Sequence, residues 1–181
     1  MANKFFCTLS VAVLLAVSGC GVLPFHKFRS AQVVSSAAVH VLSLTQRTQE
    51  ALNPTAYYAV HVKAADHTSG TVSVKQQPLI FFSPSLGGSQ LMSELSKARV
   101  AIPPVLVATG FPPGTSHAAA VKETSTLLNR FGLHWRVVYG FRNLFGTLVT
   151  GLPDTYVWRD GHVWHIPGLL PTAAEWSKAL R

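Results

Sequence analysis

Side chains that could carry out chemistry are few in this chain of 181 residues, which has two cysteines, eight histidines and seven acidic residues. Both cysteines, Cys7 and Cys20, lie within the first twenty residues. Thiol chemistry requires a thiolate, so the rest of the sequence offers no nucleophile of that kind. His162 and His165 are three apart on an expected strand and point to opposite faces, which argues against a joint metal site. With no Ser-His-Asp order, paired carboxylates or phosphate loop in evidence, the sequence predicts a protein that is not an enzyme.

The first twenty residues have the pattern of an export signal. Lys4 precedes an apolar run over residues 5–17, which is followed by small residues. The run is shorter than the about 20 apolar residues of a membrane-spanning helix. Residues 17–20, Val-Ser-Gly-Cys, resemble the lipobox of bacterial lipoproteins, which implies that residues 1–19 are removed and that Cys20 receives lipid. The resemblance implies anchoring in the cell envelope, facing the periplasm, and Gly21 favours the outer membrane of a Gram-negative cell.

Composition indicates a globular chain with one domain. Hydrophobic residues make up 48% and charged residues 12% of the sequence, a balance that argues against disorder. The formal net charge is +8, or +7 once Lys4 is removed with the signal. A basic chain favours acidic partners or an anionic membrane surface, although a solvated basic surface with no specific partner explains the charge as well. Nucleic acid is not an expected partner in the envelope.

Hydrophobic patterning divides the exported part into two regions. Residues 20–55 are expected to be a lipid-anchored tether that contains an amphipathic helix over 31–52, ended by Asn53 and Pro54. Residues 56–181 are expected to form the compact domain. Its expected strands are 57–62, 71–74, 78–82, 105–108, 135–139, 155–158 and 162–166, and its expected helices are 90–99, 116–131 and 172–180. Alternating strands and helices, then a hairpin and a helix, predict an α/β sheet that is covered on both faces.

Four stretches in this order resemble the TlpA-like extracytoplasmic thioredoxins. They are DHTSGTVSV at 66–74, LIFFSPSLGGSQLMSEL at 79–95, the segment 105–138 that closes on FGLHW, and GLPDTYV at 151–157 with Arg-Asp-Gly at 159–161. The resemblance implies a thioredoxin-like fold, in which a central mixed sheet is flanked by helices on both faces. It also implies that Pro153 is the cis-proline beside the active-site loop.

The sequence departs from that family at its chemistry. The family has Cys-x-x-Cys at the start of the first helix, where helix-end amides lower the pKa of the first thiol. Here the matching residues are Leu86, Gly87, Gly88 and Ser89. Leucine has no nucleophile, and a serine hydroxyl is a poor one without a base. The sequence therefore predicts a redox-inactive domain without cofactor, and without metal, since copper delivery by this fold needs a cysteine pair. Gly87 and Gly88 make a tight turn or an anion-binding helix start.

What remains of the family's site is a groove around Leu86, Gly87, Gly88 and Ser89 on one side and Leu152 and Pro153 on the other. The main chain beside the cis-proline pairs with an extended segment in that family, a form of binding that needs no thiol. The alternative is that Pro153 only shapes the end of the sheet. We expect a lipoprotein that binds or positions another envelope protein, by analogy in assembly of a conjugation or secretion apparatus. The alternative function is an accessory factor that holds substrate in a disulfide or cytochrome c maturation pathway.

Overall fold

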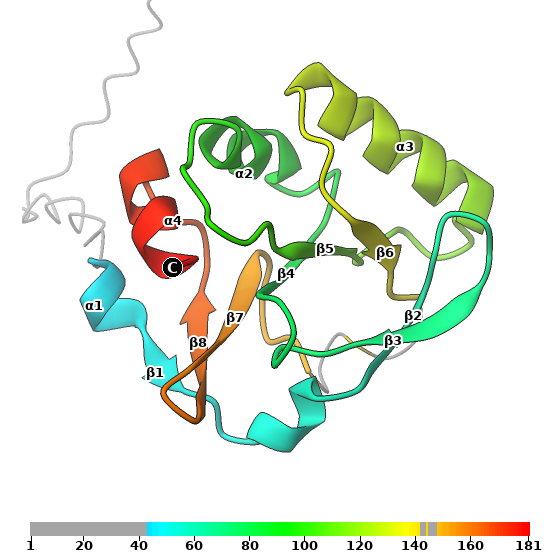
Figure 1. Ribbon diagram of the computed structural model, residues 1–181. Coiled ribbons are helices and arrows are strands. Elements are labelled where there is room, and N and C mark those ends of the chain that lie inside the picture. The colour runs from blue at the N-terminus through cyan, green and yellow to red at the C-terminus, as the bar shows by residue number, and fades with distance from the viewer. Residues whose placement is uncertain (1–42, 142–143, 145–147) are drawn as a thin grey trace, which may run out of the picture. The chain divides into compact units, whose positions relative to one another are not determined.

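The computed structural model describes residues 43–141, 144 and 148–181 (Figure 1). Its helices are α1 (Leu44–Arg47), the 3-10 turn η1 (Pro54–Tyr57), α2 (Gly88–Leu95), α3 (His117–Arg130) and α4 (Ala173–Ala179). Its strands are β1 (Gln49–Glu50), β2 (Val60–Lys63), β3 (Ser69–Val72), β4 (Leu79–Phe82), β5 (Val105–Ala108), β6 (Val137–Tyr139), β7 (Asp154–Arg159) and β8 (His162–Pro167).

All eight strands form one mixed sheet in the order β1-β8-β7-β4-β5-β6-β2-β3. The central strands β4, β5 and β6 are parallel, and β7 is antiparallel to β4. β4 and β5 read LIFF and VLVA and are buried at every residue, as strands covered on both faces should be. The antiparallel hairpin β7–β8 turns at Asp160 and Gly161, which both have positive φ. This architecture confirms the predicted thioredoxin-like α/β fold.

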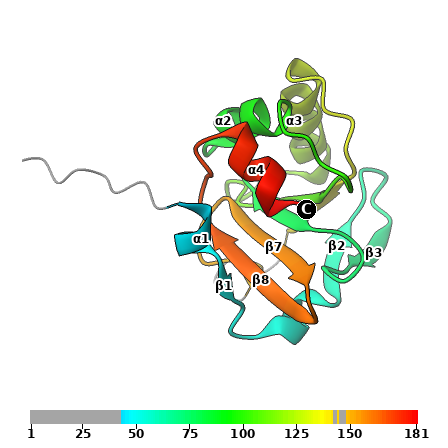
Figure 2. The same cartoon turned by 60° about the vertical axis from the view of Figure 1, so that its left-hand side comes forward.

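Two apolar layers cover the sheet, and the helices are divided unequally between them. α2, α3 and α4 pack their buried residues onto one face, against Ile80, Phe82 and Leu106. Figure 2 shows these three helices grouped together above the strands. On the opposite face, Phe81 and Val107 pack with residues of β2 and β3, with Leu144 and Val149, and with Tyr57 of η1. Among the described residues, η1 is therefore the helical element of that second face.

The two C-terminal helices begin at the residues that cap them. The Ser116 hydroxyl accepts a hydrogen bond from Ala119 N–H, and the Thr172 hydroxyl accepts one from Glu175 N–H. α3 ends before Gly132, whose φ of +64° satisfies the left-handed turn that stops a helix. At Thr172 the side chain of Glu175 returns no hydrogen bond to the cap, and its Oε2 is buried without a partner.

The N-terminal boundary of the domain lies earlier than residue 56. β1 pairs with β8, the Arg47 guanidinium donates to the carbonyl of Leu169 over 2.7 Å, and Ala51 is buried in the core. Residues 43–55 are thus part of the folded domain and not of a tether. The helix expected to run to residue 52 ends at Arg47 in its described part, because the chain turns extended at Thr48 to reach the edge of β8. Residues 20–42, including Cys20, lie outside the described residues.

The first strand expected in the compact domain begins later than predicted, and the two tryptophans of the β7–β8 hairpin lie on opposite faces of the sheet. The segment expected as a strand from residue 57 begins at Val60, because Pro54 starts a 3-10 turn that holds Tyr57 against the core. Trp158 and Trp164 do not form a cross-strand pair, because Trp158 lies opposite Val163 and Trp164 lies opposite Val157. The two indoles belong to different apolar layers of the sheet.

No helix within the described part of the chain is both long and apolar enough to cross a bilayer.

Candidate functional site

The loop after β4 is the first half of the candidate site. It leaves the sheet at the buried Ser83, whose hydroxyl oxygen accepts a hydrogen bond from Leu86 N–H over 3.3 Å and lies 3.1 Å from the Ser85 hydroxyl. This local bonding folds the loop back and turns the Leu86 side chain outward. Leu86 is 66% exposed, which is unusual for a leucine inside a compact domain. An apolar side chain is thus displayed at the position where the resembled family has its first cysteine.

Two glycines connect that loop to α2, and a glycine is favoured at each position for a different physical reason. Gly87 has φ +74° and caps the helix in the left-handed conformation that glycine adopts without strain. Gly88 is buried, and a Cβ there would lie 2.8 Å from the main-chain oxygen of Ser83 and 3.0 Å from Leu127 Cδ2. The expected tight turn is thus present, and Gly88 also lets α2 pack closely on the β4 loop and α3.

The second half of the site is the loop before β7, where the Leu152–Pro153 peptide bond is cis. Gly110, just beyond β5, lies where the loop after β4 and the loop before β7 approach each other. A Cβ on Gly110 would lie 2.8 Å from Leu152 Cδ1 and 3.4 Å from Ser83 Cβ. The side chain of Leu152 therefore lies near the root of the β4 loop, at the end of the sheet where β4 and β5 finish.

The main chain of Pro153 is hydrogen-bonded within the described fold, whereas that of Leu152 is not. The Pro153 carbonyl accepts a hydrogen bond from Gly168 N–H over 2.8 Å, which ties the loop to the end of β8. Leu152 is half-buried, and its N–H and C=O make no hydrogen bond with any other described residue. Main-chain groups that the fold leaves unpaired are the groups that an added strand would satisfy.

A buried polar cluster begins at the residue after the cis-proline. The carboxylate of Asp154, which is 1% exposed, accepts hydrogen bonds from Thr150 N–H over 3.2 Å and lies 2.6 Å from His165 Nε2. His165 Nδ1 is in turn 3.3 Å from Gln49 Nε2 on β1. A buried carboxylate is tolerated only when it is well paired, so these contacts fix the start of β7.

Two tyrosines complete this cluster. The hydroxyls of Tyr57 and Tyr156 both donate to the carbonyl of Leu148, over 2.6 and 3.1 Å, and the two rings stack at 3.8 Å. Burial raises the pKa of both hydroxyls above the ordinary value, and the charge of Asp154 adds to both shifts. Both tyrosines therefore remain neutral donors at physiological pH and act as supports for the cis-proline loop.

Sequence reasoning missed this cluster. It placed His162 and His165 on opposite faces, which is correct, since His162 is exposed beside Glu50 and His165 is buried. It did not identify Asp154 as the partner of His165. The signal was the acid directly after Pro153, at a position where a strand begins in the core and where an unpaired acid would be costly.

Ser89 lines a hollow of about 390 Å³ between the start of α2 and α3, together with Pro84, Lys122 and Arg130. Ser89 itself is exposed on the first turn of α2. The six predicted groove residues are therefore arranged as an exposed apolar tip at Leu86, an exposed Gly87 followed by a close-packed Gly88, an exposed Ser89 beside α3, and a cis-proline loop of Leu152 and Pro153.

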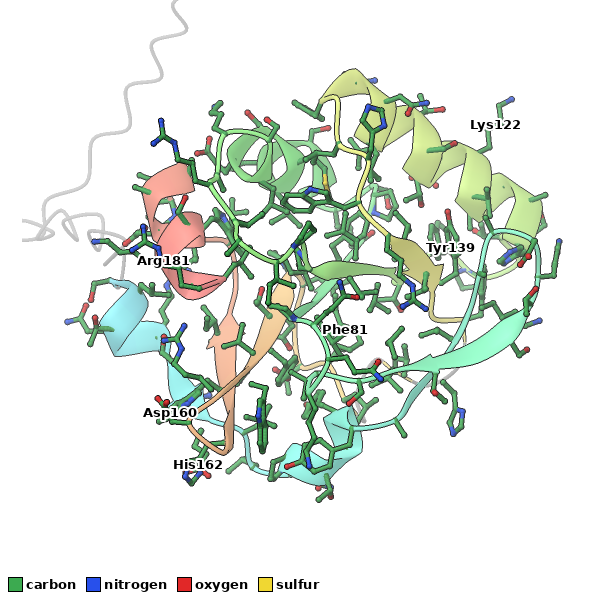
Figure 3. The ribbon with its side chains drawn as sticks, viewed as in Figure 1. Phe81, Lys122, Tyr139, Asp160, His162 and Arg181 are labelled. Atoms are coloured by element: carbon green, nitrogen blue, oxygen red, sulfur yellow. The ribbon has the colours of Figure 1, made fainter. Side chains whose placement is uncertain are left out.

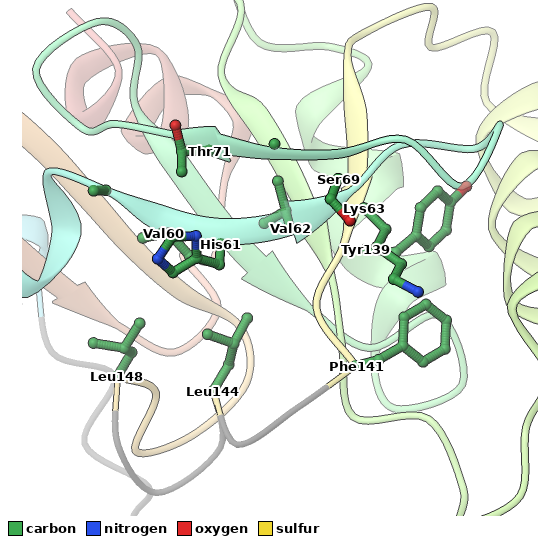
Figure 4. A pocket seen from close by; sticks show the side chains of 12 residues that line it. Val60, His61, Val62, Lys63, Ser69, Thr71, Tyr139, Phe141, Leu144 and Leu148 are labelled. Carbon is green, nitrogen blue, oxygen red and sulfur yellow. The ribbon is translucent and has the colours of Figure 1, made fainter.

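A larger hollow of about 790 Å³ lies away from this site, under the β2–β3 hairpin (Figure 4). Val62, Tyr139 and Leu148 contribute apolar surface to it, and Lys63 and His61 lie at its rim. Among the described residues there is no group of three or more histidine, cysteine or acidic side chains that could hold a metal ion.

The strand order β5-β4-β7-β8, a helix directly after β4 and a cis-proline directly before β7 together define a thioredoxin-like fold. No protein-family profile matches the chain, and no curated protein matches it. Among solved structures, a secreted disulfide oxidoreductase of Mycobacterium tuberculosis, homologous to E. coli DsbE, is similar to it at 13% identity. The match covers 68% of this chain and 96% of that one, with a TM-score of 0.49. Nothing about the activity of this chain follows from that likeness.

Proposed function

We propose that this protein is a redox-inactive, lipid-anchored thioredoxin-like lipoprotein of the cell envelope that binds an extended segment of another envelope protein and positions it. The observation that carries the proposal is the main chain of Leu152, which has no hydrogen-bond partner among the described residues and precedes a cis-proline. An extended segment could pair with both of its groups, as in binding by strand addition.

Leu86 supports the same function from the other side of the site. Its exposed side chain offers a bound segment an apolar contact in place of a thiol. Since both cysteines of the chain precede residue 21, no residue of the folded domain can form a mixed disulfide with a partner. Binding would therefore be reversible and would depend on main-chain pairing and apolar contact, which suits an assembly role in a conjugation or secretion apparatus.

Photo-crosslinking in the native envelope tests the proposal. A photoreactive amino acid would replace Leu86 in one strain and Lys178, an exposed residue of α4, in the control strain. We expect a specific protein adduct from position 86 and none from position 178, and mass spectrometry of the adduct would name the pathway. A partner from haem or disulfide maturation would point to the substrate-holding role. Equal or absent adducts at the two positions would reject the binding site.

The anchor is tested separately. Cys20 is expected to carry the lipid, so labelling with a radioactive fatty acid should mark the wild-type protein and not the Cys20→Ser variant. Because the variant keeps the whole folded domain, its loss from the membrane fraction would have the missing lipid as its cause. Labelling that persists in the Cys20→Ser variant would contradict this part of the proposal.

A further inference from the structure

The hollow between α2 and α3 has an unusual position relative to the candidate groove. Its wall on one side is formed by Pro84 and Ser89, which flank the exposed Leu86 in the sequence. Its other wall is the face of α3 that carries Lys122, Glu123, Thr126 and Arg130. Because Pro84 and Ser89 lie within three residues of Leu86, a segment bound at Leu86 would have this hollow nearby.

Two cations and one acid line the hollow. Lys122 and Arg130 are exposed, and neither lies within ion-pair distance of an acid among the described residues, including Glu123, which is exposed and lines the same hollow. Figure 3 shows Lys122 extending from α3 into solvent. The first turn of α2 adds no acid, since it reads Gly-Ser-Gln. With Lys122 and Arg130 against Glu123, the lining has a net charge of +1, in a chain whose net charge is +8.

The spacing of the cations matches an extended chain. Lys122, Thr126 and Arg130 follow one another at four-residue intervals and share one face of α3. Eight residues of helix rise about 12 Å. An extended segment advances about 3.3 Å per residue, so it covers this distance in about four residues. Side chains four apart in a strand point to the same face, so two acids at that spacing would meet both cations.

We propose that the hollow between α2 and α3 extends the groove and selects an acidic segment, in which aspartate or glutamate lies within about four residues of the residue that contacts Leu86. The inference rests on the proposed binding function and adds the chemistry of the partner. Complementary charge outside an apolar contact mainly sets specificity and the rate of association. Leu86 would supply the apolar contact. Lys122 and Arg130 would favour acidic segments over other extended segments that can make this contact.

The test is the same crosslink, made in two charge-reversed backgrounds. The first carries Lys122→Glu and Arg130→Glu. The second carries Arg99→Glu and Lys178→Glu, which change the net charge equally at exposed residues that do not line the hollow. We expect the adduct at position 86 to fall at least fivefold in the first background and less than twofold in the second. The partner peptide attached to position 86, sequenced by mass spectrometry, should carry an acid within four residues of the attachment point.

The other outcomes each reject the inference in a distinguishable way. An adduct of equal yield in both backgrounds, or a partner peptide without acids, would leave the binding function standing and remove the acidic specificity. Attachment to phospholipid would show that the basic hollow faces a membrane and not a protein segment. Absence of any adduct in the unreversed protein would reject both the binding function and its specificity. Equal thermal unfolding of the two charge-reversed proteins excludes misfolding as the cause of a lost adduct.

Discussion

Gly88 is the residue at which the start of α2 approaches the loop after β4 most closely. We expect Gly88→Ala to lower the free energy of unfolding by about 2 kcal/mol, because the new methyl group would lie 2.8 Å from a main-chain oxygen that cannot rotate away. The control is Gly151→Ala in the cis-proline loop, where a Cβ meets nothing within 4 Å and φ is not positive. That variant should stay within about 0.5 kcal/mol of wild type. Urea unfolding measures both, and equal stabilities would contradict the close packing.

The buried pair of Asp154 and His165 gives a second test at the scale of single residues. His165→Leu leaves the Asp154 carboxylate buried with only Thr150 N–H and the more distant hydroxyls as donors. We expect a loss of about 3 kcal/mol in the free energy of unfolding. His162→Leu on the same strand removes only an exposed pair with Glu50 and should cost less than about 0.5 kcal/mol. A loss at His165 no larger than that at His162 would show that the cluster does not hold the cis-proline loop.

At the scale of elements, β1 connects the preceding chain to the site. It pairs with β8 opposite His165 and Trp164, and Gln49 reaches the imidazole that contacts Asp154. Through these contacts the first described segment of the chain packs against the strand that supports the cis-proline loop.

We therefore expect a chain that begins at Asn53 to be less stable than one that begins at Ser43, by about 2 to 3 kcal/mol. The shorter chain loses the β1–β8 pairing, the Arg47 bond to Leu169 and the burial of Ala51. Urea unfolding of the two chains gives the difference. If both chains unfold at the same urea concentration, residues 43–52 are not part of the cooperative domain. The domain would then begin near residue 56, as the sequence predicted.

At the scale of the whole molecule, the domain combines a thioredoxin-like fold with Leu86 and Ser89 at the positions where the resembled family has its cysteine pair. We expect no catalysis of insulin reduction by the wild-type protein, because no thiol exists in its folded domain. The matched control is Leu86→Cys with Ser89→Cys, which returns two thiols to the start of α2, where the helix lowers thiol pKa. Turnover by this variant and not by the wild type would show that the absence of thiols at positions 86 and 89 is the cause of the inactivity. Turnover by the wild type would contradict redox inactivity.

The sequence by itself determined the elements whose apolar pattern is unambiguous. The continuous apolar runs of β4 and β5, the hairpin β7–β8 with Asp160 and Gly161 at its turn, and α3 ending before Gly132 were all predictable, because each depends on residues that are close together in the chain. The replacement of a thiol pair by Leu86 and Ser89 is also a property of the sequence alone.

Only the tertiary structure decided which of these elements meet. The pairing of β1 with β8, the approach of Leu152 and Ser83 to Gly110, and the placing of Lys122 and Ser89 around one hollow join residues far apart in the chain. The partner of His165 belongs to the same class, because a carboxylate eleven residues away becomes its neighbour only through the register of β7 on β8. Local pattern fixes which face of a strand a residue occupies, but the identity of its neighbour depends on how separate strands align.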